Sequence, residues 1–368
     1  MGTVASLLLN QDSDHFRRVN RMLNKSKRVT LFLTALLISL PTAEAAKKKP
    51  KAARAEAEIT GTVRTMLWRE PKNIRALNLF YGPGGPEHAP HTTFTFLKED
   101  LKGSNPKFDV EDENGVKWKV KLGSEARPET VASRLVWAVG YFANEDYFVP
   151  VLHVQEMPAH LHRGPPLVEP DGTSYDTRLK RELKGEKKIG EWHWRNGPFT
   201  GTREWNGLRV LMALINNWDL KDENNAVYED ERKKDSDELQ RIYMVTDLGA
   251  SFGDVRLTRD RKFSKGNLQL YQQSKFIDRI GAEYVDFEVP HRPSGAVLVN
   301  PHEYFSRVRL DWIAKRVPRA DAHWIGDLLA QLSPNQIRDA FRAAGYTPQV
   351  VEGYAAVVES RIAELKKL

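Results

Sequence analysis

The chain has no cysteine among its 368 residues. This absence excludes a disulfide framework, a thiolate metal site and attachment through a lipidated cysteine. A strong excess of one charge is also missing, because 56 Lys and Arg stand against 49 Asp and Glu, for a net charge of +7. A nucleic-acid-binding protein more often carries one concentrated basic face, so we expect no nucleic-acid partner.

Long apolar runs are missing too. The apolar stretch Val29–Leu40 has twelve residues, whereas a membrane-spanning helix needs about 20. Basic residues precede it and Ala43-Glu44-Ala45 follows it, which is the layout of a secretory signal peptide cut after Ala45. We therefore predict a signal peptide over residues 1–45 and a periplasmic or secreted location, with membrane attachment only if the signal stays uncut.

Met22 stands directly before the basic start of this signal, so residues 1–21 are interpreted as an artefactual upstream start. Residues 46–58 consist almost entirely of Lys, Arg, Ala, Pro and Glu and offer little to bury. Such a composition predicts a disordered linker. The folded part then begins near Ile59, and we expect one lobe over residues 59–155 and a second over residues 156–368.

The first lobe is expected to be rich in strands. Alternating apolar and polar residues predict three antiparallel strands, followed by a helix and a fourth strand, over Thr92–Leu97, Lys107–Val110, Val116–Leu122, Arg127–Gly140 and Tyr147–Val154. The second lobe is expected to be irregular over residues 156–190 and mainly helical after that. Its helices are predicted over 202–217, 304–316, 324–332, 334–345 and 349–368, and two short strands over 226–228 and 241–246.

One loop between these elements carries residues suited to chemistry. Asp219 follows an apolar helix, Lys221 comes two residues later and Asn224 five residues later. A second acidic turn, Asp247-Leu248-Gly249, follows the two short strands. Phosphoryl transfer uses an aspartate, a lysine and metal-binding oxygen ligands in this order.

The order of elements and these two loops resemble the protein kinase-like fold. The likeness is to its atypical branches, which include the HipA-like, lipid-kinase-like and secretory Fam20-like or CotH-like kinases. The resemblance implies an α+β, two-lobed fold, with a small antiparallel β lobe that carries one helix and a larger, mainly helical lobe. It also implies ATP or another nucleotide as a ligand, Mg²⁺ or Mn²⁺ as a cofactor, and a protein, lipid or glycan as the acceptor.

The resemblance assigns the nucleotide-binding residues to the first lobe. Lys121 ends the third strand and corresponds to the lysine that grips the phosphates, with Lys119 as its competitor. Glu129 corresponds to the glutamate that pairs with this lysine, with Glu125 as a weaker candidate. The loop that contains Gly103 and Ser104 would cover the phosphates.

The catalytic and metal-binding residues are assigned to the second lobe. Asp219 corresponds to the aspartate that accepts the substrate proton, and Lys221 would face the transferred group. Asn224 and Asp247 correspond to the two residues that hold the divalent ion.

Departures from the family pattern leave two alternatives open. Asn217 and Trp218 stand where ordinary protein kinases have histidine and arginine, and the export signal places the chain where ATP is scarce. A catalytically inactive binding module of the same fold is therefore the first alternative. Gly249–Gly253 also matches Gly-x-Ser-x-Gly, so a secreted serine hydrolase with Ser251 as nucleophile is the second.

Overall fold

The described part of the chain mixes strands and helices, as the α+β prediction requires. This computed structural model describes residues 62–101, 105–159, 161–163, 167–230, 238–254, 265–290 and 301–368. The predicted signal peptide, the predicted linker and the two loop residues Gly103 and Ser104 lie outside these ranges.

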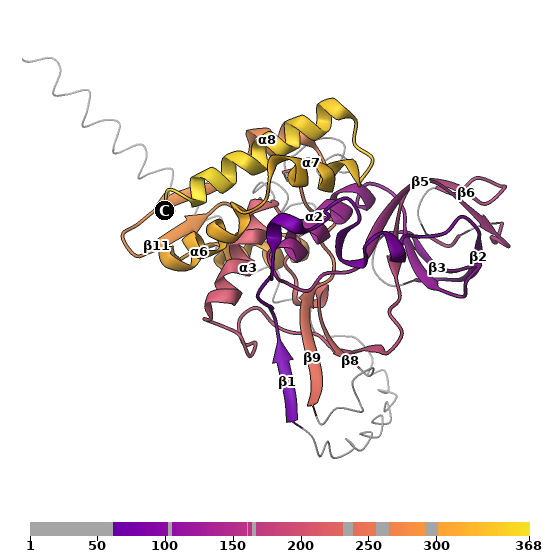
Figure 1. Cartoon of the computed structure of the whole chain (residues 1–368), viewed down its shortest axis with the longest axis horizontal. Coiled ribbons are helices and arrows are strands. Elements are labelled where there is room, and N and C mark those ends of the chain that lie inside the picture. Colours follow the sequence, from indigo (N-terminus) through magenta and orange to yellow (C-terminus); the bar gives the residue numbers. More distant parts are fainter. Residues whose placement is uncertain are drawn as a thin grey trace, which may run out of the picture. The chain divides into compact units, whose positions relative to one another are not determined.

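A closed barrel occupies one end of the described structure (Figure 1). Its strands follow one another in the order β2 (Phe94–Glu99), β3 (Lys107–Asp112), β4 (Lys117–Lys121), β6 (Thr173–Arg181) and β5 (Asp146–Gln155). Alternate residues of a strand point to opposite faces, so one face of β4 buries Trp118 and Val120. The other face carries Lys119 and Lys121.

The barrel corrects two expectations about the first lobe. The predicted boundary after residue 155 separates two neighbouring strands, because β6 pairs with both β4 and β5. The strands are also not all antiparallel, since a short parallel pairing between β2 and β5 closes the barrel. Residues 156–190 contain β6 and β7 (Glu186–Gly190) instead of being irregular throughout. The buried residues of β6 include polar ones such as Ser174 and Arg178, so its composition resembles that of a loop.

Helix α2 (Ala126–Ala138) lies between the barrel and the other helices (Figure 1) and contacts β5, β6 and α7. It ends before Gly140, whose φ of +98° is readily reached only by glycine. Arg134 of α2 is fully buried and donates hydrogen bonds to the carbonyl oxygens of Phe80, Thr130 and Asp146. These bonds join the helix to the barrel and to the preceding loop.

Two further sheets complete the described strands. The first has the order β1 (Thr62–Met66), β9 (Glu238–Val245), β8 (Asn225–Asp230) and β7, with β1 parallel to β9. The antiparallel pair β8–β9 contains the two predicted short strands. The second sheet, which was not predicted, consists of β10 (Ile277–Ile280), β11 (Tyr284–Phe287) and β12 (Val317–Pro318).

Of the remaining helices, all but α5 contribute buried apolar side chains to the larger core. They are α3 (Arg203–Leu214), α4 (Leu268–Gln273), α5 (Pro301–Val308), α6 (Arg319–Leu329), α7 (Pro334–Arg342) and α8 (Pro348–Leu365). The predicted starts of α3 and α7 agree with the caps, because Thr202 caps α3 and Ser333 forms a capping box with Gln336 at α7. Helix α6 begins at Arg319, five residues before its predicted start, and α4 was not predicted. The predicted helix over 304–316 is instead split into α5 and a short 3₁₀ turn, Asp311–Ala314.

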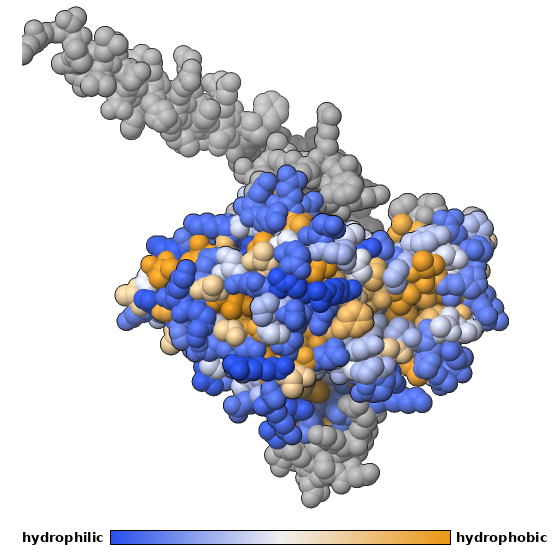
Figure 2. Space-filling model, turned by 45° about the horizontal axis from the view of Figure 1, so that its top comes forward, coloured by the Kyte–Doolittle hydropathy of each residue, from blue (hydrophilic) through white to orange (hydrophobic). Residues whose placement is uncertain are grey.

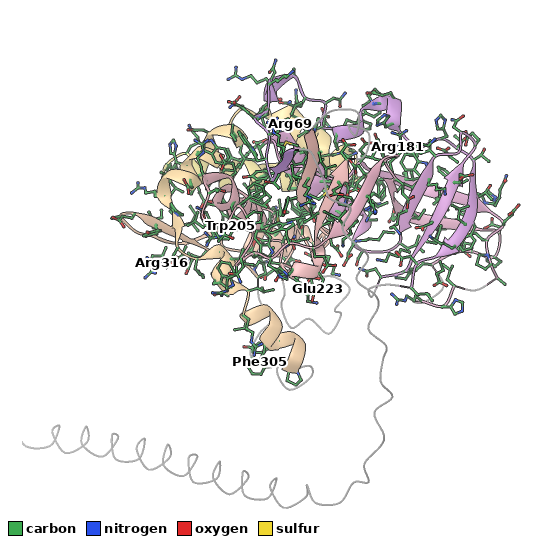
Figure 3. The ribbon with its side chains drawn as sticks, turned by 90° about the horizontal axis from the view of Figure 1, so that it is seen from below. Arg69, Arg181, Trp205, Glu223, Phe305 and Arg316 are labelled. Carbon is green, nitrogen blue, oxygen red and sulfur yellow. The ribbon has the colours of Figure 1, made fainter. Side chains whose placement is uncertain are left out.

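Polar side chains predominate on the face of the described chain that Figure 2 draws. Figure 2 shows a largely hydrophilic face with separate apolar areas, and Figure 3 shows Phe305 on α5 at the edge of the drawn side chains. No described helix combines the length and the apolar character that crossing a membrane demands.

Candidate active site

The last residue of β4, Lys121, lies at the centre of an ion-pair cluster. Its Nζ lies 2.7 Å from Glu129 Oε2, 3.0 Å from Asp247 Oδ1 and 3.2 Å from Glu125 Oε2. Strand β4 aims the side chain to one face of the barrel, and α2 begins close enough to present both glutamates to it. Lys119, the competitor, instead pairs with Asp100 and Asp109.

A second cation supports the same glutamate from β6. Arg178 Nη2 lies 2.9 Å from Glu129 Oε1, and Arg178 Nε lies 3.5 Å from Asp146 Oδ1. Arg178 stands directly opposite Lys121 in the β4–β6 pairing, so both cations leave the same face of the barrel. Glu129 is only 1% exposed, and a cation lies at each of its two oxygens, Lys121 at Oε2 and Arg178 at Oε1. Arg178 thus holds in place the Glu129 carboxylate that positions Lys121.

Glu125 joins the cluster to a third cation, which comes from a distant segment. It forms an ion pair with Lys265, and Asn105 Nδ2 donates to its Oε2 at 2.6 Å. The turn after Asp247 packs closely on this glutamate, because a Cβ placed on Gly249 would lie 2.6 Å from Glu125 Cβ. The glycine of Asp-Leu-Gly is thus needed for close approach.

The Asp219 loop runs beside the segment that carries Asp247. Trp218 N donates to the carbonyl oxygen of Ala250 at 3.2 Å, and Thr246 N donates to that of Asn224 at 2.8 Å. Within the loop, Asn224 Nδ2 donates to the Asp219 carbonyl at 2.7 Å, and Lys221 Nζ lies 3.7 Å from Asp219 Oδ1. Two hydrogen bonds therefore tie the loop to residues on both sides of Asp247.

The charges of the cluster control the protonation of Lys121 and Glu125. Burial disfavours a charged lysine, but Glu129, Asp247 and Glu125 outweigh it and raise the pKa of Lys121. Burial likewise disfavours a charged glutamate, but Lys121 and Lys265 outweigh it and hold the pKa of Glu125 at about 2. Both groups are therefore charged at neutral pH.

Glu125→Gln should lower stability at neutral pH and matter less in acid. The ordinary pKa of glutamate is 4.5, above the value of about 2 in the fold, so the unfolded chain binds the proton first as the pH falls. The stabilisation by this charge is complete above pH 4.5 and is lost between 4.5 and 2, which amounts to about 3 kcal/mol. Urea unfolding of both proteins at pH 7 and at pH 3 measures this. A difference in unfolding free energy that is equal at both pH values would contradict the assignment.

The structure brings together most of the residues singled out in the sequence. Lys121, Glu129 and Asp247 are in direct contact, and Asp219, Lys221 and Asn224 share a loop that is bonded to the neighbours of Asp247. Sequence reasoning missed Arg178, Asp146 and Lys265. Arg178 could have been found, because Thr173, Tyr175, Thr177 and Leu179 alternate around it as in a strand.

The serine of the Gly-x-Ser-x-Gly match lies inside the protein. Ser251 is 0% exposed, and its Oγ is buried without a hydrogen-bond partner among the described residues. It follows β9 in a loop and does not stand on a turn between a strand and a helix. A nucleophile in this position cannot reach a substrate, so the hydrolase alternative is not supported.

Comparison with known proteins adds little to this geometry. No family model matches the chain, and no curated protein matches it. One solved structure with some similarity is the crystal structure of a Helicobacter pylori proinflammatory kinase, CtkA. The sequences are 12% identical, the TM-score is 0.40, and the match covers 76% of this chain and 98% of that chain. Similarity at this level carries no argument, so the function is inferred from the site alone.

Proposed function

We propose that the chain is a two-lobed, kinase-like phosphotransferase that moves a phosphoryl or nucleotidyl group from ATP or another nucleotide to a protein, lipid or glycan outside the cytoplasm. The observation that carries the proposal is the contact of Lys121 with both Glu129 and Asp247, at 2.7 and 3.0 Å. A lysine fixed by a glutamate beside an acidic metal ligand is the arrangement that positions a nucleotide's phosphates.

The cluster has the composition that a divalent cation prefers. Oxygen atoms of Glu125, Glu129 and Asp247 lie within 4.8 Å of one another. The side chain of Asp247 is 39% exposed, whereas those of Glu129 and Glu125 are 1% and 5% exposed and are held by cations. Mg²⁺ usually takes one or two carboxylates together with phosphate oxygens. Asp247 is thus the carboxylate that would hold it.

Asn224 would supply the second protein ligand. Its Nδ2 donates to the Asp219 carbonyl, so its side-chain oxygen is the atom that could face a cation. Three cations, Lys121, Arg178 and Lys265, contact the carboxylates around this position, which are those of Glu125, Glu129, Asp146 and Asp247.

The protein groups then divide the work. Lys121 would bind phosphate oxygens, and its two glutamates would hold it in place without a large rearrangement. Asp219 would accept the proton of an acceptor hydroxyl, with Lys221 beside it at 3.7 Å. A bound Mg²⁺ or Mn²⁺ would offset the negative charge of the phosphates.

The inactive binding module is a second candidate, favoured by one contact. The direct ion pair between Lys121 and Asp247 occupies both groups in the absence of a nucleotide. A module that keeps this pair closed would bind no nucleotide. Nucleotide binding therefore separates the two candidates.

Thermal unfolding of the full chain should show a rise in Tm with at least one nucleoside triphosphate, and only with Mg²⁺ or Mn²⁺ present. A ligand at about 100 times its Kd adds about 2.7 kcal/mol to the free energy of unfolding. ATP, GTP, CTP and UTP form the panel, each with and without EDTA. A Tm unchanged by every nucleotide with either metal would contradict the transferase and favour the binding module.

A further inference from the structure

The carbonyl end of helix α3 leads directly into the Asp219 loop. The last carbonyl groups of a helix have no partner within the helix and need one from elsewhere. Here Leu214, the final residue of α3, accepts a hydrogen bond from Tyr271 Oη at 2.6 Å and another from Arg361 Nη1 at 2.8 Å. The same nitrogen of Arg361 also donates to Asn216 Oδ1 at 2.8 Å. Arg361 thus holds the helix end from which the loop starts.

Arg361 is a buried cation on α8. It is 2% exposed, and its guanidinium lies over the ring of Tyr271, 4.2 Å from the ring centre. Its hydrogen bonds to the described residues all reach neutral oxygens, and within the described ranges it forms no ion pair. The C-terminal end of a helix carries a partial negative charge and favours a nearby cation. The charge of Arg361 therefore complements the end of α3.

Asn216 connects the same helix end to the segment that follows Asp247. It is fully buried and has a φ of +51°, in the left-handed region. Its Nδ2 donates to the carbonyl oxygen of Gly253 at 2.8 Å and to Ser274 Oγ at 2.7 Å. Ser274 Oγ also accepts a hydrogen bond from Arg361 Nη2 at 2.8 Å. Arg361 and Asn216 therefore join the start of the loop after α3 to the segment after Asp247.

We propose, on the basis of the function proposed above, that Arg361 is a positioning residue that sets the Asp219 loop relative to Asp247. Its hydrogen bonds reach none of the residues assigned to the nucleotide, the metal or the acceptor proton, so it acts through the backbone before the loop. The ion pair between Lys121 and Asp247 does not involve it. Loss of Arg361 should therefore slow the transfer step more than it weakens nucleotide binding.

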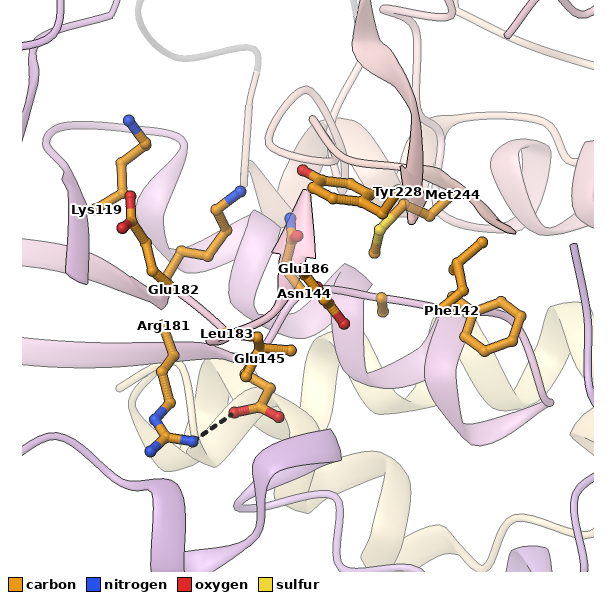
Figure 4. A pocket seen from close by; sticks show the side chains of 13 residues that line it. Lys119, Phe142, Asn144, Glu145, Arg181, Glu182, Leu183, Glu186, Tyr228 and Met244 are labelled. Carbon is orange, nitrogen blue, oxygen red and sulfur yellow. Dashed lines mark ion pairs between the residues drawn. The ribbon is translucent and has the colours of Figure 1, made fainter. Parts of the chain in front are cut away.

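A cavity of about 390 Å³ beside Arg361 allows its guanidinium to be replaced by a small molecule. Ser274 and Ser360 line this cavity together with Arg361. It shares no lining residue with the cavity in Figure 4, whose walls include Lys119 and Arg181 and which borders the strands of the ion-pair cluster. Removal of the Arg361 side chain would extend the cavity toward the end of α3, where a methylguanidinium ion could take the place of the lost group.

Amide hydrogen exchange of the full chain without nucleotide tests the positioning itself. Arg361→Ala should speed exchange in the peptides that contain Trp218 and Phe252, whose N–H groups tie the two segments together. Methylguanidinium should restore the slow exchange, whereas methylammonium, which lacks the planar fork of donors, should not. Arg338→Ala is the matched control, because Arg338 joins α7 to α8 through ion pairs with two glutamates of α8. Its loss should leave exchange in both peptides unchanged.

Turnover separates positioning from a general loss of structure. Hydrolysis of the nucleotide that raises Tm is followed by release of phosphate or pyrophosphate, with water as the acceptor. The water oxygen bonds to phosphorus, the bond from phosphorus to the leaving phosphate oxygen breaks, and Asp219 accepts the water proton. Arg361→Ala should lower kcat about 100-fold with little change in KM, and methylguanidinium should recover kcat. Arg338→Ala should keep both constants.

Arg361→Lys carries the test if Arg361→Ala does not fold. Lysine keeps the positive charge but lacks the planar fork that reaches several acceptors at once, so kcat should fall and exchange in both peptides should rise. Unchanged exchange in both variants would overturn the proposal, as would a rise in KM as large as the fall in kcat or an equal effect of Arg338→Ala. A wild-type chain without turnover would contradict the transferase, while the exchange result would still decide whether Arg361 holds the loop.

Discussion

Replacing Asp247 with asparagine should abolish the metal-dependent part of nucleotide binding while the fold persists. The substitution keeps the size of the side chain and removes the charge of the most exposed carboxylate in the cluster, at 39% exposure. Lys121 keeps its two glutamates. Because the metal bridges the protein to the phosphates, the stabilisation of about 2.7 kcal/mol at 100 times the wild-type Kd should vanish. Thermal unfolding with and without Mg²⁺ measures it.

Asp278→Asn is the matched control for this substitution. Asp278 is exposed and pairs with Lys275 and Lys315, away from the cluster. Its variant should keep the full nucleotide response. An Asp247→Asn protein that retains a Mg²⁺-dependent rise in Tm would show that another residue holds the metal.

Lys121→Met should have the largest effect on stability. Glu125 keeps Lys265 and Glu129 keeps Arg178 as cationic partners, but both carboxylates lose the ammonium group that they share at 3.2 and 2.7 Å. Removing one partner of a buried ion pair typically costs about 3–5 kcal/mol, because the remaining charge stays desolvated. We expect a loss of this size in the free energy of unfolding at pH 7, measured by urea denaturation, together with loss of nucleotide binding.

The double variant Lys121→Met/Glu129→Gln separates the ion pair from general damage to packing. Neutralising Glu129 removes one of the uncompensated charges, so the double variant should be more stable than the sum of the single effects predicts. Lys117→Met serves as control, since Lys117 is exposed on the same strand. Additive losses across the cycle would mean that Lys121 and Glu129 do not interact.

The site was predictable where its residues lie in strongly patterned elements. The alternation of Val116–Leu122 predicts the strand that ends at Lys121, and Pro128 and Glu129 mark the start of the next helix. The β-rich run before Asp247 and the glycine two residues after it predict the acidic turn. Local pattern places each residue on its element, and the contact between Lys121 and Asp247 then follows from the resemblance to a known order of elements.

The remainder depended on pairings between distant segments, which local pattern does not contain. Arg178 belongs to a strand whose buried residues are partly polar, because they meet charges of α2 and β5 and not an apolar core. Lys265 reaches Glu125 from 140 residues along the chain. The parallel pairings of β1 with β9 and of β2 with β5 leave no turn signal in the sequence. The antiparallel pair β3–β4 does have one, because Asn114-Gly115 stands between its strands.

The central claim is that Lys121, Glu129 and Asp247 form a site for a metal-bound nucleotide. Electron paramagnetic resonance of Mn²⁺ tests it most directly, because the signal of free Mn²⁺ falls when the ion binds. We expect the full chain with a nucleoside triphosphate to bind one Mn²⁺ more tightly than the same nucleotide binds it alone. Asp247→Asn should remove this gain in affinity. Equal Mn²⁺ binding by the wild-type and Asp247→Asn chains, with and without nucleotide, would contradict the account.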